Sequence, residues 1–241
     1  MNNFVSFITA GDPSLEKTRE FIEVLTEYSD VIEIGLPFSD PIAEGEVIQA
    51  ANIRALQNGT TTDKVFAMLE TVTFKKMVIL TYINPVFVYG YERFFKRCWE
   101  CGVYGVIIPD LPYEERGEAA VYADKYGVNL ITLIAPTSAE RVRMLAKDAK
   151  GFIYLVSSLG VTGVRSEFDA GLRDIVKQIR EVTDTPVFIG FGISTREQAA
   201  KMSEIADGVI VGSAFVKIIA QHGAESAPYI KKLIKELTRH V

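Results

Sequence analysis

Short apolar runs and amphipathic stretches alternate along this chain from one end to the other. The apolar runs are four to six residues long and rich in Val and Ile, which is typical of buried strands. Eight runs of this kind are strand candidates: residues 4–9, 31–35, 77–81, 105–108, 129–134, 152–155, 187–190 and 208–211.

The stretches between these runs have apolar positions three or four residues apart, which predicts helices over residues 15–28, 62–72, 91–101, 113–126, 138–149, 168–181, 195–203, 214–220 and 224–238. Strands that alternate with helices over short loops run parallel, with right-handed crossovers. Eight such units in 241 residues predict a single (β/α)8 barrel domain over residues 1–241. A doubly wound open sheet is the alternative, but the first turn, "TAGDPSLEKT", lacks the G-x-G-x-x-G that often marks it.

The amino-acid composition and net charge limit the kinds of molecule that this chain is expected to bind. The chain has 48% hydrophobic residues and a formal net charge of −5, with no basic block, so we expect neither nucleic acid nor a membrane as a partner. No apolar run is long enough to span a bilayer, and the N-terminal residues lack a signal-peptide pattern. The expectation is a soluble cytoplasmic protein. A small phosphorylated ligand remains compatible with this charge, because backbone N–H groups bind phosphate well.

The cysteines and histidines restrict the possible chemistry. Cys98 and Cys101 form a lone C-x-x-C within a helical pattern, with no second pair and no histidine nearby, so we interpret them as reduced thiols on a helix face rather than a redox or zinc site. The two histidines, His222 and His240, lie in the C-terminal helical region. We therefore expect no metal and no Ser-His or Cys-His nucleophile. Acid–base chemistry must come from carboxylates or tyrosine.

A carboxylate interrupts the second strand candidate. In "VIEIGLPFSDPIAEGEVIQ", Glu33 lies within the apolar run, and Asp40 and Glu44 follow in the next loop. Barrel active sites lie at the carboxyl ends of the strands and in the loops after them. A carboxyl group buried there has a raised pKa and can exchange a proton near neutral pH. The alternatives are a structural role for Glu33, which could form an ion pair with a basic residue or cap backbone groups in the barrel, and ordinary turn chemistry for Asp40 beside Pro41.

Glycine-rich segments follow the last strand candidates. They are "LGVTGV", "IGFGIST" and "VGSAFVKII", and the last of these opens a helix. Small residues let the backbone approach a ligand, and N–H groups at a helix start favour an anion. Barrels commonly bind phosphate after strands 7 and 8, so we expect a phosphate site here. The alternative is that these glycines only form the strand-to-helix turns.

Together these segments resemble the α subunit family of tryptophan synthase. The family pattern E-[LI]-G-x-P-[FY]-S-D-P-x-A-D-G is matched by Glu33 to Gly45 at all but one position. Further segments resemble the family in the same order along essentially the whole chain: "FITAGDP", "TYINPVFVYG", "IIPDLPYEE", "YLVSSLGVTG", "GFGIS" and "VGSAFVKII".

The resemblance implies retro-aldol cleavage of indole-3-glycerol phosphate to indole and glyceraldehyde 3-phosphate, without a cofactor, by a chain that joins a β subunit in an α2β2 complex. By position, Glu33 is implied to be the general acid/base, Glu44 the acceptor for the indole N–H, and Tyr154 the active-site tyrosine. The implied phosphate-binding residues are Gly163, Gly192, Gly212 and Ser213. The implied residues of the substrate pocket are Phe7, Tyr82, Ile107 and the loop residue Thr162.

One position departs from the family pattern. Residue 44 is glutamate where the pattern has aspartate, and the extra methylene moves the carboxylate by up to about 1.5 Å. A shift of about 1 Å can cost on the order of 100-fold in rate. Three alternatives to the active subunit therefore stay open: a catalytically weak subunit that mainly binds and activates a β subunit, a freestanding lyase, and another phosphosugar barrel. The strand 2 pattern argues against the last.

Overall fold

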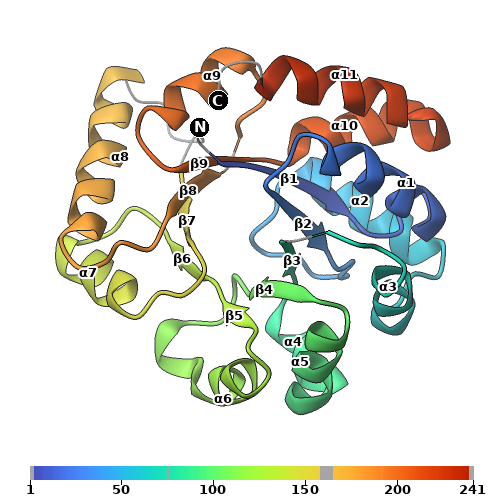
Figure 1. Cartoon of the computed structure of the whole chain (residues 1–241), viewed down its shortest axis with the longest axis horizontal. Helices are drawn as coiled ribbons and strands as arrows, with labels where there is room; N and C mark the ends of the chain where they lie inside the picture. The colour runs from blue at the N-terminus through green and yellow to red at the C-terminus, as the bar shows by residue number, and fades with distance from the viewer. Residues whose placement is uncertain (1–2, 75, 158–164, 191, 239–241) are drawn as a thin grey trace.

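Parallel strands form one closed sheet with the helices outside it, as seen down the barrel axis in Figure 1. The computed structural model describes residues 3–74, 76–157, 165–190 and 192–238. The strands are β1 (Asn3–Thr9), β2 (Val31–Gly35), β3 (Met77–Leu80), β4 (Val103–Ile107), β5 (Asn129–Leu130), β6 (Thr132–Ile134), β7 (Ile153–Val156), β8 (Val187–Gly190) and β9 (Gly208–Val211). The predicted (β/α)8 barrel is confirmed.

The fifth predicted strand is divided into β5 and β6 at Ile131. The sheet order is β5-β4-β3-β2-β1-β9-β8-β7-β6, so β5 pairs with β4 while β6 pairs with β7. The Ile131 N–H still donates to the Val106 carbonyl at 2.9 Å. In a barrel, neighbouring strands are staggered, and the two neighbours of this stretch overlap different parts of it. The stretch therefore closes the barrel.

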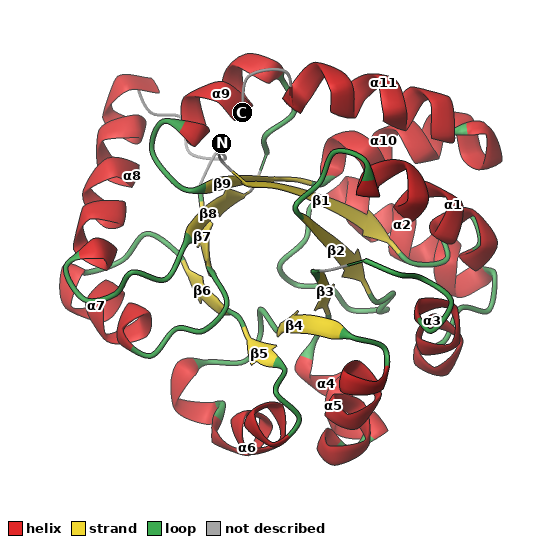
Figure 2. Cartoon of the chain, in the orientation of Figure 1, coloured by secondary structure: helices red, strands yellow, loops and turns green. Residues whose placement is uncertain are grey.

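The helices surround the strands (Figure 2). They are α1 (Leu15–Thr26), α2 (Glu46–Gln57), α3 (Thr62–Leu69), α4 (Ile83–Tyr89), α5 (Tyr91–Glu100), α6 (Gly117–Lys125), α7 (Ala139–Lys147), α8 (Arg165–Arg180), α9 (Arg196–Ser203), α10 (Ser213–His222) and α11 (Ala227–Thr238), with short 3-10 helices η1 (Tyr113–Glu115) and η2 (Gly223–Glu225). Every predicted helix is present. Two of them are divided: the one expected over residues 113–126 into η1 and α6, and the one expected over residues 224–238 into η2 and α11.

Two helices, α2 and α4, were not predicted from the sequence. The buried face of α2 consists of Ala51, Asn52 and Ala55, so it lacks the large apolar stripe by which helices are recognised. In α4, "INPVFVY", β-branched and aromatic residues obscure the helical pattern. Its proline is the third helical residue, where no intrahelical N–H is lost.

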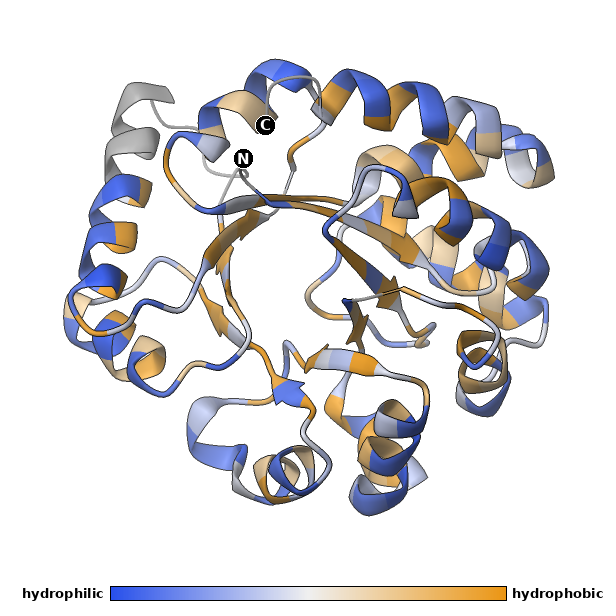
Figure 3. Ribbon diagram, in the orientation of Figure 1, coloured by the Kyte–Doolittle hydropathy of each residue, from blue (hydrophilic) through white to orange (hydrophobic). Residues whose placement is uncertain are grey.

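Two apolar layers follow from the alternation of side chains along each strand. One fills the barrel interior and includes Val5, Phe7, Val78, Phe188 and Ile210. The larger one packs between the outer face of the sheet and the helices. Figure 3 shows this pattern: the strands are mostly apolar, and the helices are polar on their outward sides. Glu33 has the same parity in β2 as the interior residue Val31, so its side chain enters the barrel.

The cysteines are buried free thiols. Cys98 lies in α5 and Cys101 directly follows that helix, as interpreted from the sequence. Burial is the largest cause that raises the pKa of both thiols, and it keeps them protonated and unreactive. Among the described helices, none is both long and apolar enough to cross a bilayer.

Candidate active site

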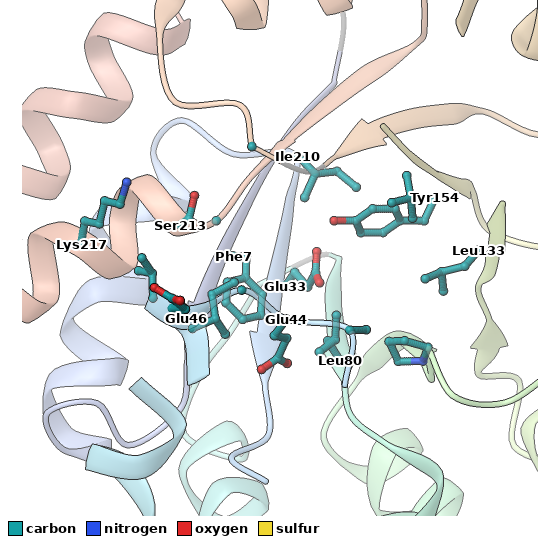
Figure 4. A pocket seen from close by; sticks show the side chains of 18 residues that line it. Phe7, Glu33, Glu44, Glu46, Leu80, Leu133, Tyr154, Ile210, Ser213 and Lys217 are labelled. Carbon is teal, nitrogen blue, oxygen red and sulfur yellow. The ribbon is translucent and has the colours of Figure 1, made fainter. Parts of the chain in front are cut away.

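A cavity of about 620 Å³ opens at the carboxyl ends of the strands (Figure 4). Its walls come from strand ends, from the loop and helix after β2, and from the start of α10. The lining residues are Phe7, Glu33, Ala43, Glu44, Gly45, Glu46, Val47, Ile48, Leu80, Pro109, Leu133, Tyr154, Val156, Gly192, Ile210, Gly212, Ser213 and Lys217. The wall is mostly apolar, with carboxylates at one side and small residues at another. This is the usual design for a flat apolar ligand with one polar end.

Glu33 is buried at the floor of this cavity. Its side chain is 1% exposed, and its Oε2 atom has no hydrogen-bond partner among the described residues. Burial, with a smaller contribution from the nearby Glu44, raises the pKa of Glu33 to about 8. The group is therefore mostly protonated at neutral pH and close enough to its pKa to give and take a proton. The structural ion pair considered for Glu33 is not found within the described parts of the chain.

Glu44 lies in the loop between β2 and α2. Its Oε2 atom accepts a hydrogen bond of 2.6 Å from Nδ2 of Asn52, and the Tyr82 hydroxyl also contacts its carboxylate. Burial is the largest influence and raises the pKa of Glu44 to about 7, while the hydrogen bonds from Asn52 and Tyr82 oppose this rise. In Figure 4 the Glu44 carboxylate points away from Glu33. The two acids therefore reach different parts of the cavity.

Tyr154 enters the cavity from β7, opposite the two acids. Its hydroxyl lies on the side toward which the Glu33 carboxylate points (Figure 4). Burial, followed by the charge of Glu33, raises the pKa of this phenol well above its usual value. It therefore stays a neutral donor at working pH. Gly190 of β8 makes room for the ring, because a Cβ there would lie 2.4 Å from the Tyr154 hydroxyl oxygen.

Two of the predicted phosphate-binding residues, Gly212 and Ser213, lie at the start of α10. Gly192, Gly212 and Ser213 all line the cavity, and Ser213 is the first residue of that helix. The free N–H groups of a first helical turn attract anions. Gly192 has φ +78, and a Cβ on Gly212 would lie 3.0 Å from the Phe7 ring, so both positions favour glycine. The predicted Gly163 and Thr162 lie outside the described residues.

Of the remaining predicted pocket residues, one lines the cavity and two lie outside its wall. Phe7 lines the cavity, whereas Tyr82 and Ile107 are not among its lining residues. Ile107 belongs to the apolar cluster in the barrel interior. Tyr82 lies behind the loop after β2, where its hydroxyl accepts from the Ala43 N–H at 3.1 Å and its ring stacks on Phe38. Tyr82 thus supports the loop that carries Glu44.

Asp40 stays outside the cavity. It is exposed, and its carboxylate accepts a hydrogen bond from the Ser39 hydroxyl, which fits the turn chemistry considered above. Sequence reasoning missed several lining residues. Leu80, Leu133 and Ile210 could have been found, because they occupy inward-facing positions near strand ends. Lys217 could also have been found, because it lies four residues after Ser213 on the same face of α10.

Comparisons with known proteins show the family of this chain. The family model described as tryptophan synthase alpha chain matches residues 1–240. The chain is 48% identical over 238 residues to the tryptophan synthase alpha chain of Lacticaseibacillus casei, covering 97% of this chain and 90% of that protein.

Solved structures give the same result. The tryptophan synthase subunit alpha of Campylobacter jejuni is 39% identical, with a TM-score of 0.91 over 98% of this chain and 95% of that chain. A chain from the tryptophan synthase α2β2 complex of Pyrococcus furiosus is 36% identical, with a TM-score of 0.89 over 98% of this chain and 99% of that one. The protein described here therefore belongs to the tryptophan synthase alpha chain family.

Proposed function

We propose that this chain is a lyase of tryptophan biosynthesis that cleaves indole-3-glycerol phosphate into indole and glyceraldehyde 3-phosphate. The observation that carries this proposal is Glu33: a buried carboxyl group with a pKa of about 8 at the floor of a mostly apolar cavity, whose Oε2 atom has no hydrogen-bond partner among the described residues. The cavity has an acceptor carboxylate on one side and a helix start suited to phosphate on another. Family membership supports the same reaction.

The reaction needs two proton transfers and no change of oxidation state overall. The bond between indole C3 and the first glycerol carbon breaks, C3 gains a proton, and the glycerol hydroxyl loses one as its carbon becomes the aldehyde. Glu33 serves both transfers, because its pKa of about 8 lets it donate and accept near neutral pH. Positive charge that develops at the ring N–H during protonation of C3 is stabilised by the Glu44 carboxylate.

The two ends of the substrate bind in two parts of the cavity, the indole ring in the apolar part and the phosphate in the anion-binding part. Phe7, Leu80 and Leu133 supply apolar walls for the indole ring. The first turn of α10, with Gly192 and Gly212 beside it, receives the phosphate. Glu33 and Glu44 lie in the same cavity, so the indole end of the substrate can be held between them.

Replacement of Glu33 by glutamine tests the proposal directly. The amide keeps the size of the side chain but cannot exchange the proton, so we expect turnover to fall by about 100-fold to 10,000-fold. Indole release from indole-3-glycerol phosphate is the measurement, with circular dichroism as the check on folding. Near-normal turnover in a folded Glu33→Gln protein would refute the assignment.

The β subunit is the partner in this function, as in the Pyrococcus furiosus complex. We propose that α4 and residues 109–115 form its docking surface, since both follow carboxyl ends of strands beside the cavity. Phe87 and Val88 of α4 are 64% and 76% exposed, which is unusual for adjacent large apolar side chains. Both segments should become protected from hydrogen exchange when β subunit is added. Unchanged exchange in both would place the surface elsewhere.

Two further expectations complete this proposal. Loops 37–47 and 157–167 should close over bound substrate and shield the reaction from water; residues 158–164 lie outside the described part of the chain. We place the reaction in the cytoplasm, a choice supported by the two buried free cysteines, because reduced thiols persist in a reducing compartment. Cell fractionation checks this placement.

A further inference from the structure

The carboxylate of Glu44 is anchored by a residue outside the cavity wall. Asn52 of α2 is 2% exposed, and its Nδ2 atom donates to Glu44 Oε2 at 2.6 Å. The other buried residues of α2 are alanines. A buried amide is costly unless it is hydrogen-bonded, so an asparagine at this position needs a partner. Glu44 provides it.

The backbone of Glu44 is held from the same helix face. Gln49 lies three residues before Asn52, and its side-chain N–H donates to the Glu44 carbonyl at 2.7 Å. On the other side, the Tyr82 hydroxyl accepts from the N–H of Ala43, next to Glu44. The loop and its carboxylate are thus positioned by α2 and Tyr82 before any ligand is bound.

Two donors hold the Glu44 carboxylate. The Asn52 amide occupies Oε2 and the Tyr82 hydroxyl also contacts the carboxylate, so the group has a defined direction in the cavity before substrate is bound. The glutamate side chain reaches back to Asn52 of α2 while Glu44 remains part of the cavity wall.

The same contact affects the charge of Glu44. A donor to the ionised carboxylate favours that form, and it opposes the burial that raises the pKa of Glu44 to about 7. Other ionisable groups face the same cavity: Glu33 from β2, Glu46 from α2, Tyr154 from β7 and Lys217 from α10, with Tyr82 in contact from behind the loop. Only an ionised carboxylate is a strong acceptor for a ring N–H that gains positive charge.

We propose that Asn52 is a positioning residue for the lyase reaction: its amide fixes the Glu44 carboxylate in place and favours its ionised form. The proposal rests on the proposed role of Glu44 as acceptor for the indole N–H. Asn52 itself does not line the cavity and acts only through Glu44.

The direct test is a carbon-13 NMR titration of the Glu44 carboxyl group in the natural protein and in Asn52→Ala. We expect the pKa of Glu44 to be higher in the variant, because one of the two hydrogen bonds that oppose the effect of burial is then lost. Asn58→Ala is the matched control: Asn58 ends the same helix and donates to the Pro13 carbonyl instead. An unchanged Glu44 pKa in Asn52→Ala would overturn the proposal.

Kinetics separate this proposal from the proposed function. We expect kcat for indole release to fall by roughly tenfold in Asn52→Ala with little change in KM. In a plot of kcat against pH, the acidic limb should move to higher pH in the variant. In a Glu44→Gln background, Asn52→Ala should cause no further loss, whereas a merely structural role would add one. If the pKa of Glu44 rises in Asn52→Ala but kcat is unchanged, the effect of the Asn52 hydrogen bond on Glu44 is confirmed, and the catalytic role of Glu44 is refuted.

A measurement on the natural protein covers the case in which Asn52→Ala does not fold. The side-chain amide signals of Asn52 should change with pH at the same midpoint as the Glu44 carboxyl, because the two groups share a hydrogen bond. Asn58 amide signals should show no such midpoint. Asn52 signals that do not follow Glu44 would overturn the proposal.

Discussion

Glu33 should lower the stability of this protein at neutral pH, because its pKa is higher in the folded chain than in the unfolded one. In the unfolded chain the group has an ordinary pKa of 4.5, and in the folded chain its pKa is about 8. Below pH 4.5 both states hold the proton and the difference vanishes. Between pH 4.5 and 8 the folded state keeps a proton that the unfolded state has lost, so stability falls as pH rises.

The magnitude follows from the pKa difference. Each pH unit in this window costs about 1.4 kcal/mol, so ionisable Glu33 lowers the free energy of unfolding by about 3 kcal/mol at pH 7 and by about 5 kcal/mol above pH 8. The glutamine side chain in Glu33→Gln cannot ionise, so the variant does not lose this free energy of unfolding as pH rises. The variant that loses catalysis should therefore gain stability as pH rises, relative to the natural protein.

Urea unfolding of both proteins between pH 4.5 and 8.5 is the assay. The buried amide of glutamine has its own cost, but that cost does not vary with pH, so the informative quantity is the change of the stability difference with pH. Glu46→Gln is the control, since Glu46 is exposed at the cavity rim and its variant should follow the natural protein. Parallel curves for the natural protein and Glu33→Gln would refute the reasoning, because they would mean that Glu33 ionises alike in both states.

Two other variants test the arrangement of the cavity. Gly190→Ala would place a Cβ 2.4 Å from the Tyr154 hydroxyl oxygen, so we expect the ring to be displaced and kcat to fall by about tenfold to 100-fold; a rate equal to that of the natural protein would contradict the packing. Glu44→Asp shortens the side chain by about 1.5 Å and breaks its contact with Asn52, so we expect slower indole release with or without β subunit. If the natural protein releases indole only at the background rate and Glu44→Asp releases it faster, the result would favour the hypothesis of a catalytically weak subunit.

Much of the fold could be predicted from the sequence because its signals are local. Each strand is a short apolar run, each recognised helix has an apolar stripe, and their alternation leaves few topologies open. Glu33 was recognisable for the same reason, since a charged residue inside an apolar run stands out without any tertiary information. Helix α2 was not recognisable, because Ala51, Asn52 and Ala55 on its buried face are small or polar.

The tertiary structure decided everything that depends on residues far apart in the chain. Closure of the barrel at Ile131, the support of the Glu44 loop by Tyr82, and the place of Lys217 in the cavity wall all join separate units. The same holds for the charge of Glu33, since the pKa of about 8 arises from burial by side chains of several strands. The sequence by itself thus determined which groups could do chemistry, through their type and their place in a local pattern. Packing alone determined where those groups point and which of them are ionised, because distances and desolvation exist only in the folded chain.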